Sequence, residues 1–371
     1  MKKIPVSQPE LTPLCKEYAT DAINAGAISG LFGGYIEKFE NAFAKFCGVN
    51  HCISCSNGTT AIHLALLAVG VKQGDEVLVS ATTNMATFFA VEYLGAVPIP
   101  VDIDPLTYTI DPADLQNKVS DKSVAILCVH LFGQLCDMNA IKQIASKNEL
   151  KIVEDCAEAH GASYFGRKAG SFGDVSAFSF FSNKLLTCGE GGAVVTNDAA
   201  ISEKVRDLKS LAFGKTSKFL HEDLGYNYRL TNIACAIGFS QTQQADKLIN
   251  QRIKVCEKYI NEFSEISEFI KAPIKRDAYF NTHWMAHFQL TSNAKIKREE
   301  FLQKLRENGI ETREGFIPYT LQTYRGKVVD LNSCPIANSL AFNTFYLPTF
   351  NSISDDDQSY IINTVKRILL K

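Results

Sequence analysis

Short apolar runs alternate with helical stretches over the first two-thirds of this chain. Strands are expected at residues 51–55, 76–80, 97–102, 123–130, 151–155, 175–181 and 192–196, and helices at 59–70, 85–94, 138–147 and 199–210. One strand contains Val124-Ala125-Ile126-Leu127-Cys128-Val129, which is apolar at every position. Because such a strand is buried on both faces, it is typical of a mainly parallel sheet with helices on both sides. The alternation therefore predicts an α/β domain.

The pattern changes near residue 245. A long helix is expected at 245–263, followed by strands at 285–290 and 311–314, a helix at 297–308 and a final helix at 355–370. A chain of 371 residues suits about two domains. We expect a large α/β domain at 1–245 and a smaller C-terminal α+β domain at 246–371, with Trp284 and Phe288 in the core of the smaller one.

Charge and composition narrow the functional classes. With 38 basic and 40 acidic side chains and a net charge of −2, the chain has no electrostatic footprint for nucleic acid. It has neither an apolar run of about 18 residues nor the pattern of a signal peptide, so we expect a cytoplasmic protein with no membrane partner. The 11 cysteines are scattered, and the close pair Cys52 and Cys55 has no second pair or histidine at ligand spacing, so we expect no metal site.

Polar residues follow three of the expected strands, at the sheet edge where α/β proteins bind ligands. Ser56-Asn57-Gly58-Thr59-Thr60-Ala61 joins a strand to a helix N-terminus, which attracts phosphate, although such junctions also simply cap helices. Asp155 ends a second strand and needs a partner such as a protonated ring nitrogen, unless it caps the next helix. Lys184 follows a third strand, where it either extends into water or uses its amine as a nucleophile.

Taken together, these strand ends match what pyridoxal 5′-phosphate requires. The cofactor needs an anion cradle, an acidic partner for its ring nitrogen and an amine that binds its aldehyde. One alternative is an NAD-dependent oxidoreductase, but no G-x-G-x-x-G turn follows the first strand. Another is an inactive relative that serves as a binding subunit, and the presence of both Lys184 and Asp155 argues against it.

Five segments also carry a resemblance to a known family. They are Ser56-Asn57-Gly58-Thr59-Thr60-Ala61, Glu154-Asp155-Cys156-Ala157-Glu158, Phe178-Ser179-Phe180-Phe181-Ser182-Asn183-Lys184, Gly189-Glu190-Gly191-Gly192 and Tyr226-Asn227-Tyr228-Arg229-Leu230-Thr231-Asn232. From about residue 36 to 241 the chain resembles the DegT/DnrJ/EryC1/StrS sugar aminotransferases, and it does so more loosely to the C-terminus. The resemblance implies the aspartate aminotransferase-like fold type I of pyridoxal-phosphate enzymes. It also implies a homodimer whose subunits share their active sites.

The resemblance assigns roles position by position. It implies that Lys184 is the catalytic lysine that forms the Schiff base with the cofactor, and that Asp155 is the catalytic partner of the pyridine nitrogen. The remaining cofactor contacts that it implies are Gly58, Thr59 and Ser179 at the phosphate, Asn227 at the phosphate from the partner subunit, and Glu158 near the 3′-oxygen. Asn84 stands where the family usually has an aromatic residue stacked on the ring.

The resemblance further implies L-glutamate as amino donor and a keto sugar as acceptor. The expected acceptor is a nucleotide-linked 4-keto-6-deoxyhexose used in surface polysaccharide biosynthesis. The alternative is a free 8-keto sugar acid, the acceptor of 8-amino-3,8-dideoxy-octulosonate transaminases. Arg313 would then serve its carboxylate instead of a nucleotide phosphate, since a guanidinium suits either anion. The candidate substrate residues are Arg229, Arg313, Tyr319 and Thr320, although each arginine equally suits an interface or surface ion pair.

Overall fold

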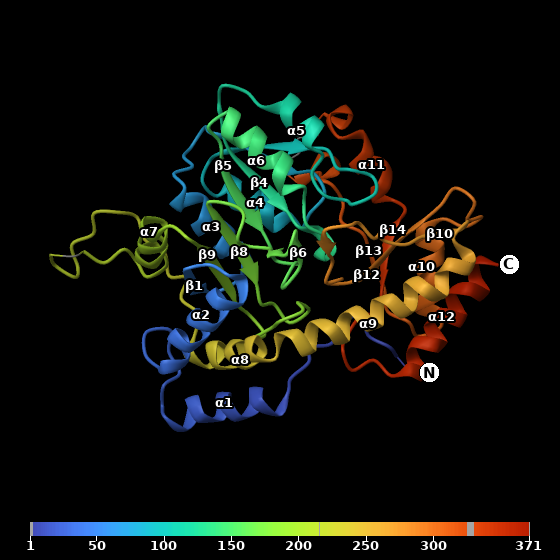
Figure 1. The fold of residues 1–371 in the computed structure, drawn as a ribbon, viewed down its shortest axis with the longest axis horizontal. Coiled ribbons are helices and arrows are strands. Elements are labelled where there is room, and N and C mark those ends of the chain that lie inside the picture. The colour runs from blue at the N-terminus through green and yellow to red at the C-terminus, as the bar shows by residue number, and fades with distance from the viewer. Residues whose placement is uncertain (1–2, 215, 325–329, 371) are drawn as a thin grey trace.

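A seven-stranded sheet lies at the centre of the larger part of the molecule (Figure 1) in the computed structural model, which describes residues 3–214, 216–324 and 330–370. The strand order is β1-β9-β8-β5-β4-β2-β3. The bounds are β1 (His51–Cys55), β2 (Glu76–Ser80), β3 (Val97–Val101), β4 (Ser123–Val129), β5 (Lys151–Asp155), β8 (Val175–Ser179) and β9 (Gly192–Thr196). Neighbours from β8 through β5, β4 and β2 to β3 pair in parallel, whereas β9 is antiparallel to both β1 and β8. The predicted mainly parallel sheet is confirmed.

Helices cover both faces of this sheet. The expected helices are α3 (Gly58–Ala68), α4 (Met85–Glu92), α6 (Met138–Lys147) and α7 (Ala199–Lys209). Four further helices were not predicted from the sequence: α1 (Pro13–Asn24), α2 (Gly34–Cys47), α5 (Pro112–Lys118) and α8 (Asn232–Gln243). The signal for α2 was present, because Tyr35, Phe39, Phe43 and Cys47 recur at i, i+4 spacing, and all four are buried on one face.

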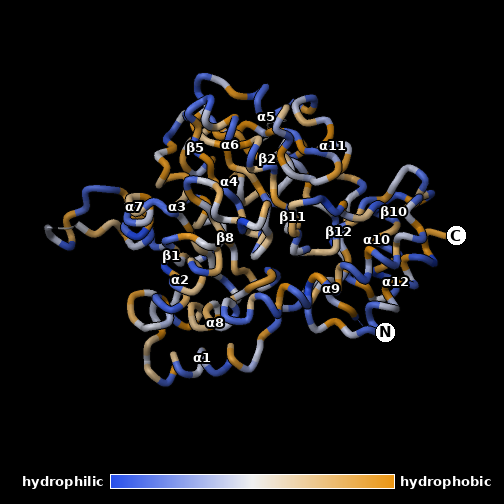
Figure 2. The backbone as a smooth tube through the Cα atoms, in the orientation of Figure 1, coloured by the Kyte–Doolittle hydropathy of each residue, from blue (hydrophilic) through white to orange (hydrophobic). Residues whose placement is uncertain are grey.

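The C-terminal part lies beside the sheet and is joined to it by the long helix α9 (Ala245–Phe263), as Figure 1 shows. The tube through α9 alternates between hydrophilic and hydrophobic colours (Figure 2), as expected for a helix with one buried face. A four-stranded sheet, in the order β10-β12-β14-β13, packs with the remaining helices. Their bounds are β10 (Ile270–Lys271), β12 (Ala286–Leu290), β13 (Arg313–Glu314), β14 (Thr344–Leu347), α10 (Arg298–Glu307), α11 (Pro335–Ala341) and α12 (Asp355–Leu369).

Several short elements complete the chain and connect its two parts. A three-stranded sheet contains β6 (Ser163–Tyr164), β7 (Arg167–Lys168) and β11 (Tyr279–Phe280), and short 3-10 turns lie at Leu131–Gly133, Ser264–Ile266, Tyr319–Leu321 and Leu331–Ser333. Near the N-terminus, Ile4 bridges to Ile310 and packs in the C-terminal core. The domain boundary near residue 245 stays a prediction. No helix in the described ranges combines the length and the apolar character needed to span a membrane.

Two aromatic residues close in sequence, Trp284 and Phe288, pack in different hydrophobic cores. Phe288 packs in the C-terminal core, as the sequence predicted. The same prediction was wrong for Trp284, which lies in a cluster with Phe132 and Tyr346 and has Phe316 packed against it. We call Phe132, Trp284, Phe316 and Tyr346 the junction cluster. It joins the end of β4 to the C-terminal sheet, and its members Trp284, Phe316 and Tyr346 form one wall of the cavity described next.

Candidate active site

A cavity of about 430 Å³ opens at the carboxyl ends of the parallel strands. Its size suits a small cofactor with part of a substrate. The sequence-predicted residues that line it are Gly58, Thr59, Asn84, Asp155, Glu158, Ser179 and Lys184. The structure therefore brings together residues from four separate segments of the chain at the sheet edge where the sequence analysis expected a ligand.

The N-terminus of α3 forms an anion cradle on one side of the cavity. The Asn57 side chain accepts a hydrogen bond from the Thr60 N–H at 2.9 Å, and the Thr60 hydroxyl accepts one from the Asn57 N–H at 3.2 Å. This capping box fixes the first turn, in which the N–H groups of Gly58 and Thr59 have no acceptor within the helix. A Cβ added to Gly58 would lie 2.7 Å from the Cβ of Ser179, so only glycine lets β8 approach this turn so closely. Two N–H groups and a hydroxyl fit a phosphate here.

Asp155 lies at the end of β5, inside the cavity wall. Its carboxylate accepts hydrogen bonds from the Thr87 hydroxyl at 2.8 Å and from the Ala157 N–H at 3.1 Å. Burial raises the pKa of Asp155, against the lowering effect of these two donors and of the Lys184 charge. The chain after Asp155 forms turns rather than a helix, so the helix-cap alternative is wrong. A buried carboxylate of this kind fits a protonated ring nitrogen, which would complete its set of partners.

Lys184 extends into the cavity and not into water. Its side chain is 11% exposed, and its Nζ lies 3.6 Å from Glu158 Oε1. On another side, Nζ lies 4.1 Å from the centroid of the Trp284 ring. The solvated-lysine alternative is therefore wrong, and the amine lies where an aldehyde bound in the cavity would meet it.

Glu158 faces Lys184 across the cavity. Its second oxygen accepts a hydrogen bond from the Phe132 N–H at 3.0 Å. Phe132 has a left-handed backbone with φ 53°, which a non-glycine residue rarely adopts. Burial raises the pKa of Glu158 to about 7, although Lys184 and the Phe132 N–H lower it. Glu158 therefore titrates near neutral pH and is able to hold a proton next to the lysine.

Asn84 lines the cavity as the residue that caps α4. Its side-chain oxygen accepts a hydrogen bond from the Ala86 N–H at 3.0 Å. This contact explains why an amide stands at this position, because asparagine is a favoured helix cap and an aromatic residue is not. Stacking of Asn84 on a cofactor ring stays a prediction.

Two predicted residues, Asn227 and Arg229, lie outside the cavity lining of their own chain. Asn227 forms a bridge with Ser210, and an Arg229 nitrogen donates to the Ser210 hydroxyl at 3.3 Å. They follow the segment after α7, which extends away from the sheet in Figure 1. Their contacts with the cofactor and the substrate stay predictions.

The three predicted substrate residues from the C-terminal part are not brought into the cavity lining among the described residues. Arg313 is half exposed and pairs with Glu311 at 2.6 Å, as its ion-pair alternative predicted. The Tyr319 ring stacks on Phe88 with a centroid distance of 4.1 Å. Thr320 is buried, and its hydroxyl donates to Asn338. Contacts of these residues with a substrate stay predictions.

Other lining residues were missed by the sequence analysis. They are Asn57, Ile62, Thr83, Ala86, Thr87, Val129, Ala157, Phe181, Asn183, Glu190, Trp284, Phe316 and Tyr346. Asn183 and Glu190 stand inside motifs that had already been singled out, so proximity in sequence was a usable signal. Trp284, Phe316 and Tyr346 have no such signal, because docking of the C-terminal part brings them to the cavity.

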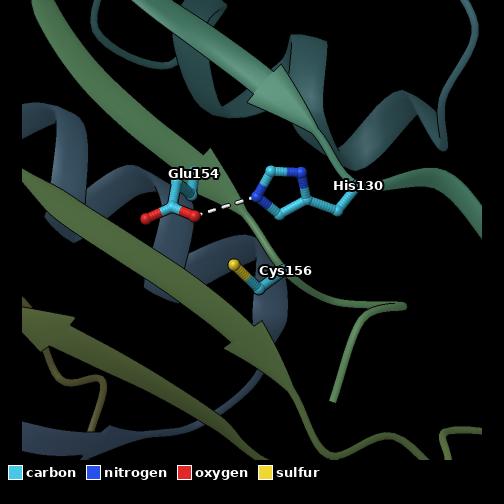
Figure 3. Close-up of side chains that lie close together, drawn as sticks. All are labelled: His130, Glu154 and Cys156. Atoms are coloured by element: carbon cyan, nitrogen blue, oxygen red, sulfur yellow. Dashed lines mark hydrogen bonds and ion pairs between the residues drawn. The ribbon is translucent and has the colours of Figure 1, made fainter. Parts of the chain in front are cut away.

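A second polar group is formed by the buried side chains of His130, Glu154 and Cys156, which lie close together (Figure 3). Glu154 and Asp155 are consecutive in a strand, so their side chains point to opposite faces of the sheet. Glu154 accepts hydrogen bonds from five donors: His130 Nε2, the Ser176 hydroxyl and the N–H groups of Gly170, Phe172 and Gly173. Burial alone would raise the pKa of Glu154, but hydrogen bonds from His130, Gly173 and Ser176 outweigh it and hold the pKa below its usual value.

The histidine in this group is fully engaged as well. His130 Nδ1 accepts the Cys136 N–H at 3.2 Å, so the ring proton lies on Nε2 and is donated to Glu154. Neither ring nitrogen then has a lone pair free to bind a metal. These contacts make the group a structural network that anchors the loop around Gly170 to β5.

Comparison with known proteins identifies the family. Residues 10–366 match the model of the DegT/DnrJ/EryC1/StrS aminotransferase family. The chain is 41% identical over 366 residues to a GDP-perosamine synthase of Escherichia coli O157:H7, with 98% of each chain covered. It is 36% identical over 371 residues to a GDP-perosamine synthase of Caulobacter vibrioides, covering 100% of this chain and 99% of the relative.

A solved structure agrees with these relatives. The chain is similar to S. venezuelae DesV in complex with a ketimine intermediate, with a TM-score of 0.91, 29% identity and 100% of both chains covered. This similarity confirms the predicted fold type I and the predicted class of enzyme. The chain is a pyridoxal-phosphate-dependent aminotransferase and belongs to the DegT/DnrJ/EryC1/StrS family.

Proposed function

We propose that this enzyme transfers an amino group from L-glutamate to a nucleotide-linked 4-keto-6-deoxyhexose, as the name GDP-perosamine synthase of three relatives suggests. The product would serve the synthesis of a surface polysaccharide such as the O-antigen of lipopolysaccharide, and the enzyme would act in the cytoplasm. One observation carries the proposal: a single cavity collects Lys184, Asp155 and the cradle formed by Gly58, Thr59 and Ser179.

The cavity residues divide the binding of pyridoxal phosphate among them. The cradle would hold the phosphate, Asp155 would keep the ring nitrogen protonated, and the Lys184 amine would bind the aldehyde. When bound, the cofactor supplies a ring that accepts electrons from the bond broken at the substrate carbon. Asp155 assists by keeping its negative charge opposite the nitrogen.

Lys184 would then act as both base and acid. With the donor bound, its Nζ would take the proton from the donor's α-carbon as a base and would then give it up as an acid, while the cofactor, when bound, would accept the electron pair of the broken C–H bond. With the keto sugar in place of glutamate, the same proton transfers would occur in the opposite direction. Glu158, 3.6 Å from Nζ, lies close enough to balance the charge of the lysine as the proton moves.

The names of the relatives favour the nucleotide-linked acceptor over the sugar acid. Three relatives, at 35–41% identity, are GDP-perosamine synthases. Arg313, which would suit either a sugar-acid carboxylate or a nucleotide phosphate, is paired with Glu311 outside the lining and does not distinguish the two acceptors. We therefore propose the nucleotide-linked sugar.

We also propose a homodimer in which each chain completes the cavity of the other. Asn227 would reach the partner's cofactor phosphate, and Arg229 would supply a cation for the carboxylate of glutamate. Exposed apolar side chains on the segment after α7 and on the loop before α2 support the proposal, because apolar patches on a surface mark interaction sites. The most exposed of them are Leu31 (58%), Phe32 (72%), Phe219 (79%) and Leu224 (76%).

A substrate panel tests the proposed function. The purified enzyme is incubated with glutamate and keto sugars, nucleotide-linked or free, and 2-oxoglutarate is followed. We expect product with a nucleotide-linked 4-keto-6-deoxyhexose and none with the 8-keto sugar acid; the reverse result would contradict the proposed acceptor. The Lys184→Ala variant should keep the fold, bind the cofactor only non-covalently and show no turnover, and near-normal turnover would remove Lys184 from its role.

A further inference from the structure

Trp284 contacts the lysine segment in two independent ways. Its indole Nε1–H donates to the backbone oxygen of Asn183 at 2.9 Å, immediately before Lys184 in the chain. Its ring face lies 4.1 Å from Lys184 Nζ. A buried indole N–H needs an acceptor, and a ring face attracts a cation, so both parts of the side chain are used at the same place.

The backbone at Trp284 is itself held firmly. Its carbonyl oxygen accepts a hydrogen bond from a guanidinium nitrogen of Arg252 at 2.6 Å, and Arg252 is buried on α9. The ring also stacks against Phe132, with an interplanar angle of 13°, and against Phe316, with an angle of 9°. The indole therefore has little freedom to move, and the connection runs from α9 through Trp284 to the lysine.

The Lys184 amine lies between two unlike neighbours. Glu158 offers a carboxyl oxygen at 3.6 Å, which is too long for a good hydrogen bond, and Trp284 offers a flat apolar surface. When Nζ takes a proton from the substrate α-carbon, it becomes an ammonium ion in a site that is mostly shielded from water. A ring face stabilises such a charge without competing for the proton, which a carboxylate would do.

We propose that Trp284 is the positioning residue of Lys184 during proton transfer. In that step the α-carbon C–H bond breaks, a new N–H bond forms at Nζ, and the electron pair passes to the cofactor; the proton then moves from Nζ to C4′. Trp284 holds the backbone before Lys184 and stabilises the positive charge that develops on Nζ. This inference rests on the proposed function, because it requires Lys184 to be the acid and base.

Fluorescence of the cofactor-free protein tests the contact directly. Trp284 is the single tryptophan of the chain, so all indole emission comes from this site. Lys184→Met removes the cation over the ring and should change the emission of the folded protein. Lys168→Met is the matched control, because Lys168 Nζ lies 4.0 Å over the Phe46 ring away from the cavity, and it should leave the emission unchanged. Unchanged emission in Lys184→Met would overturn the proposal.

Kinetics of the loaded enzyme test the role. Trp284→Leu removes both contacts and should lower kcat about tenfold with KM for either substrate within about twofold. The isotope effect with α-deuterated glutamate should rise, because the step that breaks the C–H bond becomes slower relative to the others. Trp284→Phe keeps a ring face but lacks the Nε1–H hydrogen bond, so its kcat should lie between those of Trp284→Leu and the wild type. If Trp284→Leu does not fold, Trp284→Phe provides the test in its place.

Two controls distinguish a positioning role of Trp284 from a purely structural role and from a substrate-binding role. Phe288→Leu removes a buried aromatic ring from the C-terminal core and should leave the isotope effect at the wild-type value. A rise in KM for the sugar alone, with kcat and isotope effect unchanged, would make Trp284 a substrate platform and overturn the proposal. Turnover that survives Lys184→Ala would instead defeat the proposed function, independently of the Trp284 variants.

Discussion

Asp155 is a carboxyl group that the protein shields from water and surrounds with donors. The Thr87 hydroxyl and the Ala157 N–H occupy part of its oxygens, which leaves capacity for one more cationic partner. Asp155→Asn keeps the shape and removes the charge that would hold the ring nitrogen protonated. We expect turnover to fall about a hundredfold, as for a lost buried charge pair of about 3 kcal/mol, with a small change in unfolding free energy. Urea unfolding and steady-state assays measure the two; a variant that mainly unfolds would contradict the catalytic role.

Glu158 makes the stability of the cofactor-free protein depend on pH. Its pKa is about 7 in the folded state against an ordinary value of 4.5, so between these values the folded chain keeps a proton that the unfolded chain has lost. The contribution of Glu158 to the unfolding free energy is therefore fully present below pH 4.5. It falls by about 3 kcal/mol as the pH rises to about 7.

Glu158→Gln should remove that loss. The variant should match the wild type near pH 4.5 and exceed it above pH 7, as urea unfolding across this range would measure. Glu17→Gln, at an exposed position on α1, is the matched control and should show no such difference. A Glu158→Gln difference that does not change with pH would contradict the prediction.

At the scale of elements, the first turn of α3 and the end of β8 approach each other, at the proposed phosphate cradle, only because Gly58 has no side chain. In Gly58→Ala the new Cβ would lie 2.7 Å from the Ser179 Cβ, and overpacking of this kind costs about 1–3 kcal/mol. We expect cofactor affinity to fall about tenfold or more, measured by titration of the cofactor-free protein. Gly34→Ala at the start of α2 is the control, since nothing lies within 4 Å of its added Cβ, and it should bind normally. Equal affinities in the two variants would argue against a phosphate at α3.

The elements differ in how well the sequence predicts them. β4 and α6 have the bounds expected from the sequence to within one residue, because a continuous apolar run in β4 and a strong 3.6-residue period in α6 each specify one local structure. Short strands such as β10 and β14 were missed, since two to four residues carry too little pattern and depend on pairing with distant partners.

The site residues also differ in how well the sequence predicts them. Lys184, Asp155 and the cradle follow strand ends, and parallel strands place such ends together. Trp284, Phe316 and Tyr346 reach the cavity only through docking of the C-terminal part, which no local pattern encodes. Trp284 was assigned to the wrong core for that reason.

At the scale of the whole molecule, Lys184 is the one basic side chain among the described residues that line the cavity, so the proposed donor glutamate would need a further cation from outside this lining. Asn227 and Arg229 both contact Ser210 and lie outside the cavity lining of their own chain. If the active sites are shared in a homodimer, two different defects placed in different chains should be repaired by mixing them.

Mixing two inactive variants tests this sharing. Lys184→Ala abolishes the chemistry, and Asn227→Asp places a negative charge against the phosphate of the neighbouring site. In a dimer containing one chain of each variant, one cavity combines an intact Lys184 with an intact Asn227, while the other carries both defects. Random reassembly of equal amounts should restore about a quarter of wild-type activity, because half of the dimers are mixed and each has one working site.

Mixing Lys184→Ala with Asp155→Asn is the control and should restore nothing, since both defects then lie in the chain's own cavity lining and each mixed dimer has no intact site. Activity absent from the first mixture would show that each chain builds its site alone.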